Sequence, residues 1–226
     1  MSRNCSNIIF FVADGTMEAI LHVLLHERFR SLNIIPEFTR YTRIITHPNH
    51  DPGLYENVEL IRQLTQYSED TCTLVMLDEQ WDGSPGKEEI ESKIRQDLAK
   101  INLANNEVIV ISPSIDLWAW TGSRCFLKEI NWDSGFEDLL EFLTLNGYEI
   151  GNFCEANDIC FCPKPKQPKE SLVFMLNRIS RPLAREFFIN IAKCASLQRC
   201  CIESFLRFKS TVQYWSRILS SINPTI

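Results

Sequence analysis

The sequence predicts an α/β protein with a mostly parallel sheet, because short apolar segments alternate with amphipathic ones over the first 125 residues. The apolar run at 7–12 predicts a buried strand, and the helical spacing of leucine and isoleucine in 17–32 predicts the helix after it. The clearest strand is 71–77, TCTLVML, which is short, β-branched and apolar. This order is typical of a sheet with helices on its faces.

The remaining segments divide the chain into a predicted core, residues 1–125, and a mainly helical C-terminal extension, residues 126–226. In the core we expect a strand near 33–47 interrupted at Pro36, a turn at 49–55, helices at 55–66 and 90–101, and a strand at 107–113. In the extension we expect an extended proline- and lysine-rich connector at 163–170 and helices beginning near residues 134, 171, 183 and 204.

Charge and hydropathy restrict the classes of protein. The formal net charge of −6 argues against coating nucleic acid by bulk electrostatics, although the C-terminal third is basic. A nucleic-acid surface, if present, is therefore expected at Lys164, Lys166, Lys169, Arg181 and Arg185. No apolar run approaches the roughly 20 residues that span a bilayer, and no secretory signal is recognised, so we expect a cytoplasmic protein without membrane contact.

The cysteines and histidines give no clear metal motif. CFC at 160–162 and the pair Cys200-Cys201 are too closely spaced for ordinary zinc ligands. In a cytoplasmic protein the nine cysteines are expected to be reduced and mostly buried. His22 and His26 are spaced for one helix face and are expected to be partly exposed.

Acidic residues follow the predicted strands. Asp14 and Glu18 follow the first strand, Asp78 ends the strand at 71–77 with Asp82 in the next loop, and Asp116 follows the strand at 107–113. Since parallel strands end at one edge, these carboxylates can converge there and hold Mg²⁺, which activates water and stabilises phosphoryl transfer. Alternatively, each acid caps a helix or complements its dipole.

Other motifs are less informative. Trp118 and Trp120 directly follow a predicted buried strand, and we expect them to be core residues and not surfaces for base stacking. The sequence contains no GxSxG, GxxxxGK[ST], HExxH or GxGxxG, and a cysteine–histidine nucleophile pair has no local signature.

The segments VADGTME, LVMLD and IDLWAW resemble the motifs of Toprim-type domains, which occur in topoisomerases, primases and overcoming-lysogenization-defect nucleases. The chain is most similar to small bacterial Toprim-like proteins encoded with ATPases of mobile or phage-defence loci, and the connector and final helices extend this resemblance. The resemblance implies that Glu18 or Asp14 is a general acid/base, that Asp78, with Asp82, holds Mg²⁺ or Mn²⁺, and that Asp116 completes the site.

The chain departs from the Toprim pattern at three positions: Asp14 and Asp116 replace glutamates, and Gln80 replaces the second aspartate of a DxD motif. The expected function is a Mg²⁺-dependent nuclease or related phosphotransfer component of a bacterial anti-phage system, acting on DNA or RNA with an ATPase or other subunit. The alternatives are a non-catalytic Toprim-fold subunit that binds a partner protein, and a protein that binds a nucleotide or second messenger at the same edge.

Overall fold

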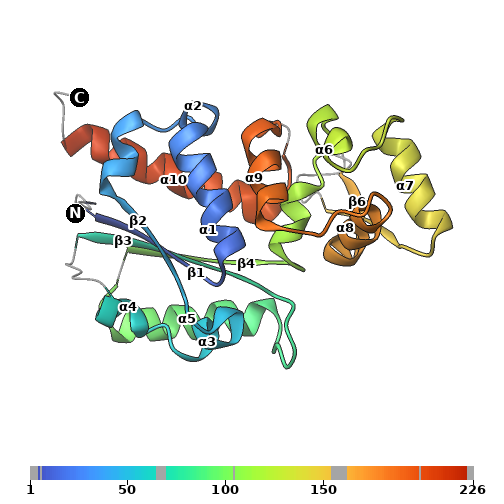
Figure 1. Ribbon diagram of the computed structural model, residues 1–226. Helices are drawn as coiled ribbons and strands as arrows, with labels where there is room; N and C mark the ends of the chain where they lie inside the picture. The colour runs from blue at the N-terminus through green and yellow to red at the C-terminus, as the bar shows by residue number, and fades with distance from the viewer. Residues whose placement is uncertain are drawn as a thin grey trace.

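The computed structural model contains a four-stranded parallel sheet between two layers of helices (Figure 1). It describes residues 5, 7–64, 70–103, 105–153, 162–198 and 200–222. The strands are β1 (Asn7–Val12), β2 (Thr42–Thr46), β3 (Thr71–Asp78) and β4 (Asn105–Ile111), in the spatial order β2-β1-β3-β4. The predicted α/β class and parallel sheet are therefore confirmed.

The strand order places a topological switch point between β1 and β3. β1 is hydrogen-bonded to β2 on one side and to β3 on the other, and Val12 is paired with both Thr46 and Met76. The chain thus winds in opposite directions from β1, and the carboxyl ends of all strands meet at one edge. Open α/β sheets commonly bind ligands beyond the carboxyl ends of their strands, at such a switch point.

Helices cover both faces of the sheet (Figure 1). One face carries α1 (Gly15–His22), the π-helix Val23–Glu27, α2 (Phe29–Leu32), α9 (Arg185–Cys194) and α10 (Glu203–Ile222). The other face carries α3 (His50–Glu56), α4 (Leu60–Leu64) and α5 (Lys87–Lys100). Alternating side chains of β1 fill both layers: Phe10 packs against Phe208 and Trp215 of α10, whereas Phe11 packs against His47.

The rest of the C-terminal half lies beyond the carboxyl ends of the strands (Figure 1). Its elements are the 3-10 turn η3 (Ile115–Ala119), α6 (Arg124–Glu129), α7 (Phe136–Leu145), β5 (Ile150–Asn152), β6 (Pro163–Pro165) and α8 (Pro168–Asn177). These elements are mainly helical. The connector expected to be extended over 163–170 is extended only at β6, because α8 already begins at Pro168, a residue that the first turn of a helix accepts. However, α9 and α10 return to the sheet and complete its second layer, so the C-terminal half is packed into the core.

The second strand and the following turn differ from the prediction. Pro36 begins a 3-10 helix, Pro36–Tyr41, so β2 starts only at Thr42. The segment 49–55, predicted as a turn from its proline and glycine, forms most of α3, whose helical backbone accepts Pro52 in its first turn. Residues 65 and 66 of the next expected helix lie outside the described residues.

The expectation that all nine cysteines are reduced is wrong for four of them. Cys5 is bonded to Cys72 near the amino ends of β1 and β3, and Cys125 of α6 is bonded to Cys194 of α9. Both pairs are distant in sequence, so spacing alone gave no signal for them. Within the described residues, no helix is both long and apolar enough to cross a membrane.

Candidate functional site

Each strand of the parallel sheet leads into an aspartate at its carboxyl end. Asp14 follows β1, Asp51 lies in the first turn of α3 after β2, Asp78 is the last residue of β3, and Asp116 lies in η3 after β4. We call these four residues the aspartate cluster. Asp14, Asp78 and Asp116 thus follow the carboxyl ends of three neighbouring parallel strands at one edge of the sheet, and Asp51 follows the fourth strand.

Asp14 caps α1. Its Oδ1 accepts hydrogen bonds from the backbone N–H groups of Thr16 and Met17, at 2.7 and 2.9 Å, and its backbone is extended as an N-cap requires. The capping interpretation therefore holds for this residue. Among the described residues no hydrogen bond is made to Oδ2, so the same carboxylate retains one oxygen for another role.

Asp78 is buried, with 8% of its surface exposed, as is Asp116, with 6%. Its Oδ1 accepts a 2.7 Å hydrogen bond from the backbone N–H of Ile115, and its own N–H donates to Asp51 Oδ1, also at 2.7 Å. Burial raises the pKa of Asp78 well above its usual range, and the charges of Asp51, Asp14 and Asp116 raise it further. The hydrogen bond from Ile115 acts in the opposite direction but is the smallest influence.

The other two acids are held by local polar groups. Burial raises the pKa of Asp116, against the hydrogen bond from Ser114 Oγ (3.0 Å) and the positive charge of Lys169. Burial likewise raises the pKa of Asp51, against the hydrogen bond from the Asp78 N–H, while the charge of Asp14 contributes in the same direction as burial. The cluster therefore concentrates negative charge in a poorly solvated place.

Glu18 lies on the rim of the cluster, one turn into α1. Its Oε2 accepts a hydrogen bond from Thr46 Oγ1 at 3.1 Å and forms an ion pair with Arg185 at 3.5 Å. The guanidinium of Arg185 also approaches Gly15, so the start of α9 covers the start of α1. Both side chains of the ion pair are about half exposed and open to solvent.

Asp82, the predicted auxiliary metal ligand, is not brought to the cluster. It is exposed in the loop between β3 and α5, and it is absent from the described groups that shift the pKa of Asp78. The polypeptide turns away because Gln80 N–H is bonded to Pro113 O and Ser84 Oγ is bonded to Glu79 O.

The five basic residues predicted to contact nucleic acid fall into three groups. Lys169 and Arg185 lie beside the aspartate cluster, next to Asp116 and Glu18. Lys166 and Arg181 form 2.7 Å ion pairs with Glu149 and Glu129. Lys164 is buried, with only 4% exposed, and so does not present its charge on a surface that nucleic acid can reach.

The two tryptophans are core residues, as predicted. Trp118 is 8% exposed and donates its indole N–H to Ser204 Oγ, whereas Trp120 is fully buried and donates to Pro168 O. These bonds fasten η3, and with it Asp116, to α8 and α10. His22 and His26 are exposed and stacked on each other, with ring centroids 4.3 Å apart.

The donor chemistry of the cluster suits Mg²⁺, since all four side chains supply oxygen. Among the described residues, however, no group of three or more histidine, cysteine, aspartate or glutamate side chains is arranged to hold a metal ion. Mg²⁺ usually takes only one or two carboxylates and completes its shell with water and substrate phosphate. Asp14 and Asp78 each keep one oxygen without a hydrogen bond in the described part of the chain, so these two carboxylates are available for such a smaller site.

Sequence reasoning missed Asp51. Its segment NHDPGLY was interpreted as turn chemistry, and the second strand was placed too early by its apolar residues. The available signal was positional: Asp51 is the first acidic residue after β2, as Asp14 is after β1.

Searches for similar proteins found no matching family model, no matching curated protein and no matching solved structure.

Proposed function

We propose that the chain is a Toprim-like protein that binds Mg²⁺ or Mn²⁺ at the aspartate cluster and acts as a nuclease or related phosphotransfer component of a bacterial anti-phage system. The single observation that carries this proposal is the placement of one aspartate at the carboxyl end of each strand. The pKa of Asp78 is raised by the three others, so the carboxylates are close enough to repel one another. A bound cation relieves that repulsion.

In this proposal Asp78 holds the metal together with Asp14 or Asp116. The ion supplies an activated water and stabilises negative charge on a phosphoryl group. Glu18 acts as the general acid/base, because it lies on the rim, is half exposed and is positioned by Thr46. Asp82 has no role in this arrangement.

The basic residues on the rim orient an anionic substrate. Arg185 and Lys169 come from α9 and α8 and border the cluster from two sides, beside Glu18 and Asp116. When a phosphate ester enters between them, one of its oxygens replaces Glu18 as the partner of Arg185. The carboxylate of Glu18 is then free to accept or donate a proton.

A second candidate is a non-catalytic subunit that keeps the fold and binds a partner protein. It is favoured by the hydrogen bonds of Asp14 and Asp78, which serve the local backbone. In that case the acids position α1 and η3, and no metal is required.

The decisive experiment is a calorimetric titration of the full chain with Mn²⁺, followed by cleavage assays on DNA and RNA in Mg²⁺. We expect Mn²⁺ binding that is lost in Asp78→Asn. The matched control is Asp82→Asn, which makes the same chemical change at an exposed residue outside the cluster. Binding that survives in Asp78→Asn contradicts the metal proposal, and absence of binding in the folded wild type favours the partner-binding subunit.

A further inference from the structure

Lys164 is a buried lysine for which the described part of the chain supplies no carboxylate partner. It lies in β6, where Gly151 of β5 is its paired residue, and it is 4% exposed. No ion pair or hydrogen bond of its Nζ occurs within the described part of the chain. Lys166, two residues further on, shows the ordinary arrangement: it is exposed and pairs with Glu149.

Lys164 lines a cavity of about 160 Å³, which we call the Lys164 pocket. Its walls are formed by Trp118, the Thr121–Ser123 loop, Cys162, Ser196 and Cys200, all of them described residues. Three hydroxyl groups and one ammonium line it, and none of the lining residues is acidic. Burial accordingly lowers the pKa of Lys164, against a smaller opposing effect of neighbouring cysteines.

An apolar cavity of about 40 Å³ lies next to this pocket, between α1, the π-helix and α9. It shares the wall residues Trp118, Thr121, Ser196 and Cys200 with the Lys164 pocket. Its other walls are almost entirely aliphatic or aromatic, with Leu24 from the π-helix among them. The Lys164 pocket, with its lysine and hydroxyl groups, therefore borders an apolar cavity across Trp118 and its neighbours.

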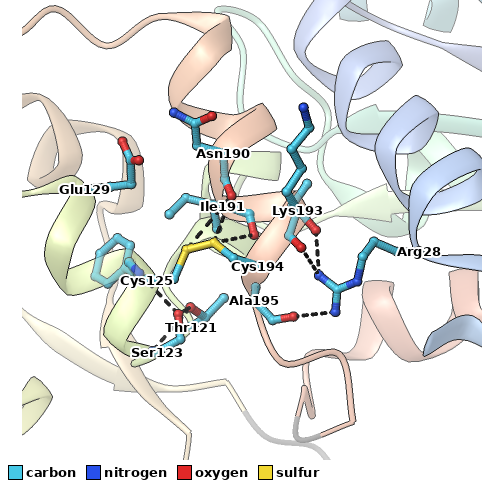
Figure 2. The surroundings of a disulfide bond; sticks show 12 residues. Arg28, Thr121, Ser123, Cys125, Glu129, Asn190, Ile191, Lys193, Cys194 and Ala195 are labelled. Carbon is cyan, nitrogen blue, oxygen red and sulfur yellow. Dashed lines mark hydrogen bonds between the residues drawn. A yellow bond between two sulfur atoms is a disulfide. The ribbon is translucent and has the colours of Figure 1, made fainter. Parts of the chain in front are cut away.

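Two sets of bonds hold the Thr121–Ser123 and Ser196 sides of the Lys164 pocket. The Cys125–Cys194 disulfide joins the residue two after Ser123 to the residue two before Ser196, and Figure 2 shows Thr121 and Ser123 beside it. On the other side of α9, the Arg28 guanidinium donates to the carbonyl oxygens of Ala192, Lys193 and Ala195, at 3.0, 2.7 and 2.9 Å (Figure 2). A pocket held by a covalent cross-link and three charge-assisted bonds loses little conformational freedom when a ligand binds.

We propose that the Lys164 pocket binds a small organic monocarboxylate, with the carboxylate on Lys164 Nζ and the apolar body against Trp118. Charge balance selects this class, because one buried ammonium is neutralised by one negative charge. A neutral ligand leaves the ammonium unpaired, and a phosphate dianion leaves a buried excess charge. The size also fits, since a cavity of about 150 Å³ accommodates a benzene ring.

Benzoate is the test ligand, and benzamide is its uncharged counterpart of nearly equal shape. Binding to the full chain is followed by tryptophan fluorescence and by calorimetry, with Trp118→Phe to assign the optical signal. We expect saturable benzoate binding, with affinity at least 10-fold lower for benzamide. Lys164→Met keeps the apolar stem and removes the charge, so we expect it to fold and to bind benzoate at least 10-fold more weakly.

The matched control is Lys166→Met, which makes the same substitution at an exposed residue and should leave benzoate affinity unchanged. The proposal is overturned by equal affinity for benzoate and benzamide, by unchanged benzoate affinity in Lys164→Met, or by no saturable binding to the wild type. Tighter binding of inorganic phosphate than of benzoate also overturns it, in favour of a site for small inorganic oxyanions. If Lys164→Met fails to fold, the benzoate–benzamide comparison in the wild type still decides.

Discussion

The aspartate cluster and the Lys164 pocket are opposite in charge, and the described residues balance the charge of neither one. In the cluster, Asp78 is surrounded by three further acids, and Lys169 acts chiefly on Asp116. In the pocket, the described residues that line the space around Lys164 carry hydroxyl and thiol groups and no carboxylate. Burying an unbalanced charge lowers the stability of the folded state. A ligand of the opposite charge can therefore stabilise the protein at either region.

The ion-pair network around Arg207 provides a contrast, because its partly buried charges are paired with one another. Arg207 of α10 bonds to Glu91 at 2.6 Å, to Glu107 at 2.5 Å and to Val108 O at 2.6 Å. These carboxylates raise the pKa of the guanidinium, although partial burial acts against them. Here every charge has a partner, and the network joins α10 to α5 and β4.

The largest expected effect concerns the cross-link behind the Lys164 pocket. Replacing both Cys125 and Cys194 with serine should lower the free energy of unfolding by about 2–4 kcal/mol, because the unfolded chain regains the freedom of a long loop. It should also weaken benzoate binding while leaving Mn²⁺ binding intact. The Cys125–Cys194 disulfide joins α6 to α9, and none of the four aspartates lies in either helix. Urea denaturation and calorimetry measure both quantities.

The matched control is the double serine variant of Cys5 and Cys72, whose disulfide lies near the amino ends of the strands. It should cost comparable stability and leave benzoate affinity unchanged. Equal effects of both double variants on benzoate would show that the pocket responds to global stability and not to its own cross-link.

Removing a balanced charge should be destabilising. Arg207→Met leaves Glu91 and Glu107, which are 19% and 26% exposed, without their main partner. We expect a loss of about 2–3 kcal/mol in the free energy of unfolding, below the range for a fully buried pair because solvent reaches part of the network. Arg217→Met, at an exposed position of the same helix, should change stability by no more than about 0.5 kcal/mol. Urea denaturation of both variants tests the difference.

The sequence predicts the buried strands and the acids at their ends better than it predicts the Lys164 pocket. Periodicity located β1 and β3 because burial on both faces leaves a continuous apolar run, as in TCTLVML. Strand-end position located Asp14, Asp78 and Asp116. Burial of Lys164 could not be inferred, because its Pro-Lys-Pro surroundings are typical of an exposed connector, and only tertiary packing turns that side chain inward.

Removing an unbalanced charge should raise the free energy of unfolding, whereas Arg207→Met should lower it. The pH dependence of this stabilisation identifies the group that is responsible. An acid whose pKa rises on folding binds its proton more tightly in the native state, so stability falls as the pH rises from about 4 through the raised pKa. For Asp78 we therefore expect metal-free wild type to lose stability over that interval and Asp78→Asn to lose less. At pH 7 the variant should be more stable by about 0.5–2 kcal/mol, the usual range for stabilising substitutions.

The difference between wild type and Asp78→Asn is the quantity to measure, by urea denaturation at a series of pH values. His26 and His47 have lowered pKa values, so both proteins also lose stability as the pH falls below about 6.5, and the difference cancels this shared effect. Parallel curves for the two proteins would contradict the assignment of an unbalanced charge to Asp78.

The smallest effect separates the two roles of Asp14. Asp14→Ala removes the cap of α1 and should cost about 1 kcal/mol of stability. Asp14→Ser keeps a side-chain oxygen that can accept from the N–H groups of Thr16 and Met17, so its stability should stay close to that of the wild type. Serine cannot supply the carboxylate, however, and both variants should weaken Mn²⁺ binding to the same extent. If Asp14→Ser restores Mn²⁺ affinity along with stability, Asp14 acts only by positioning α1, and the metal depends on Asp78 and Asp116 alone.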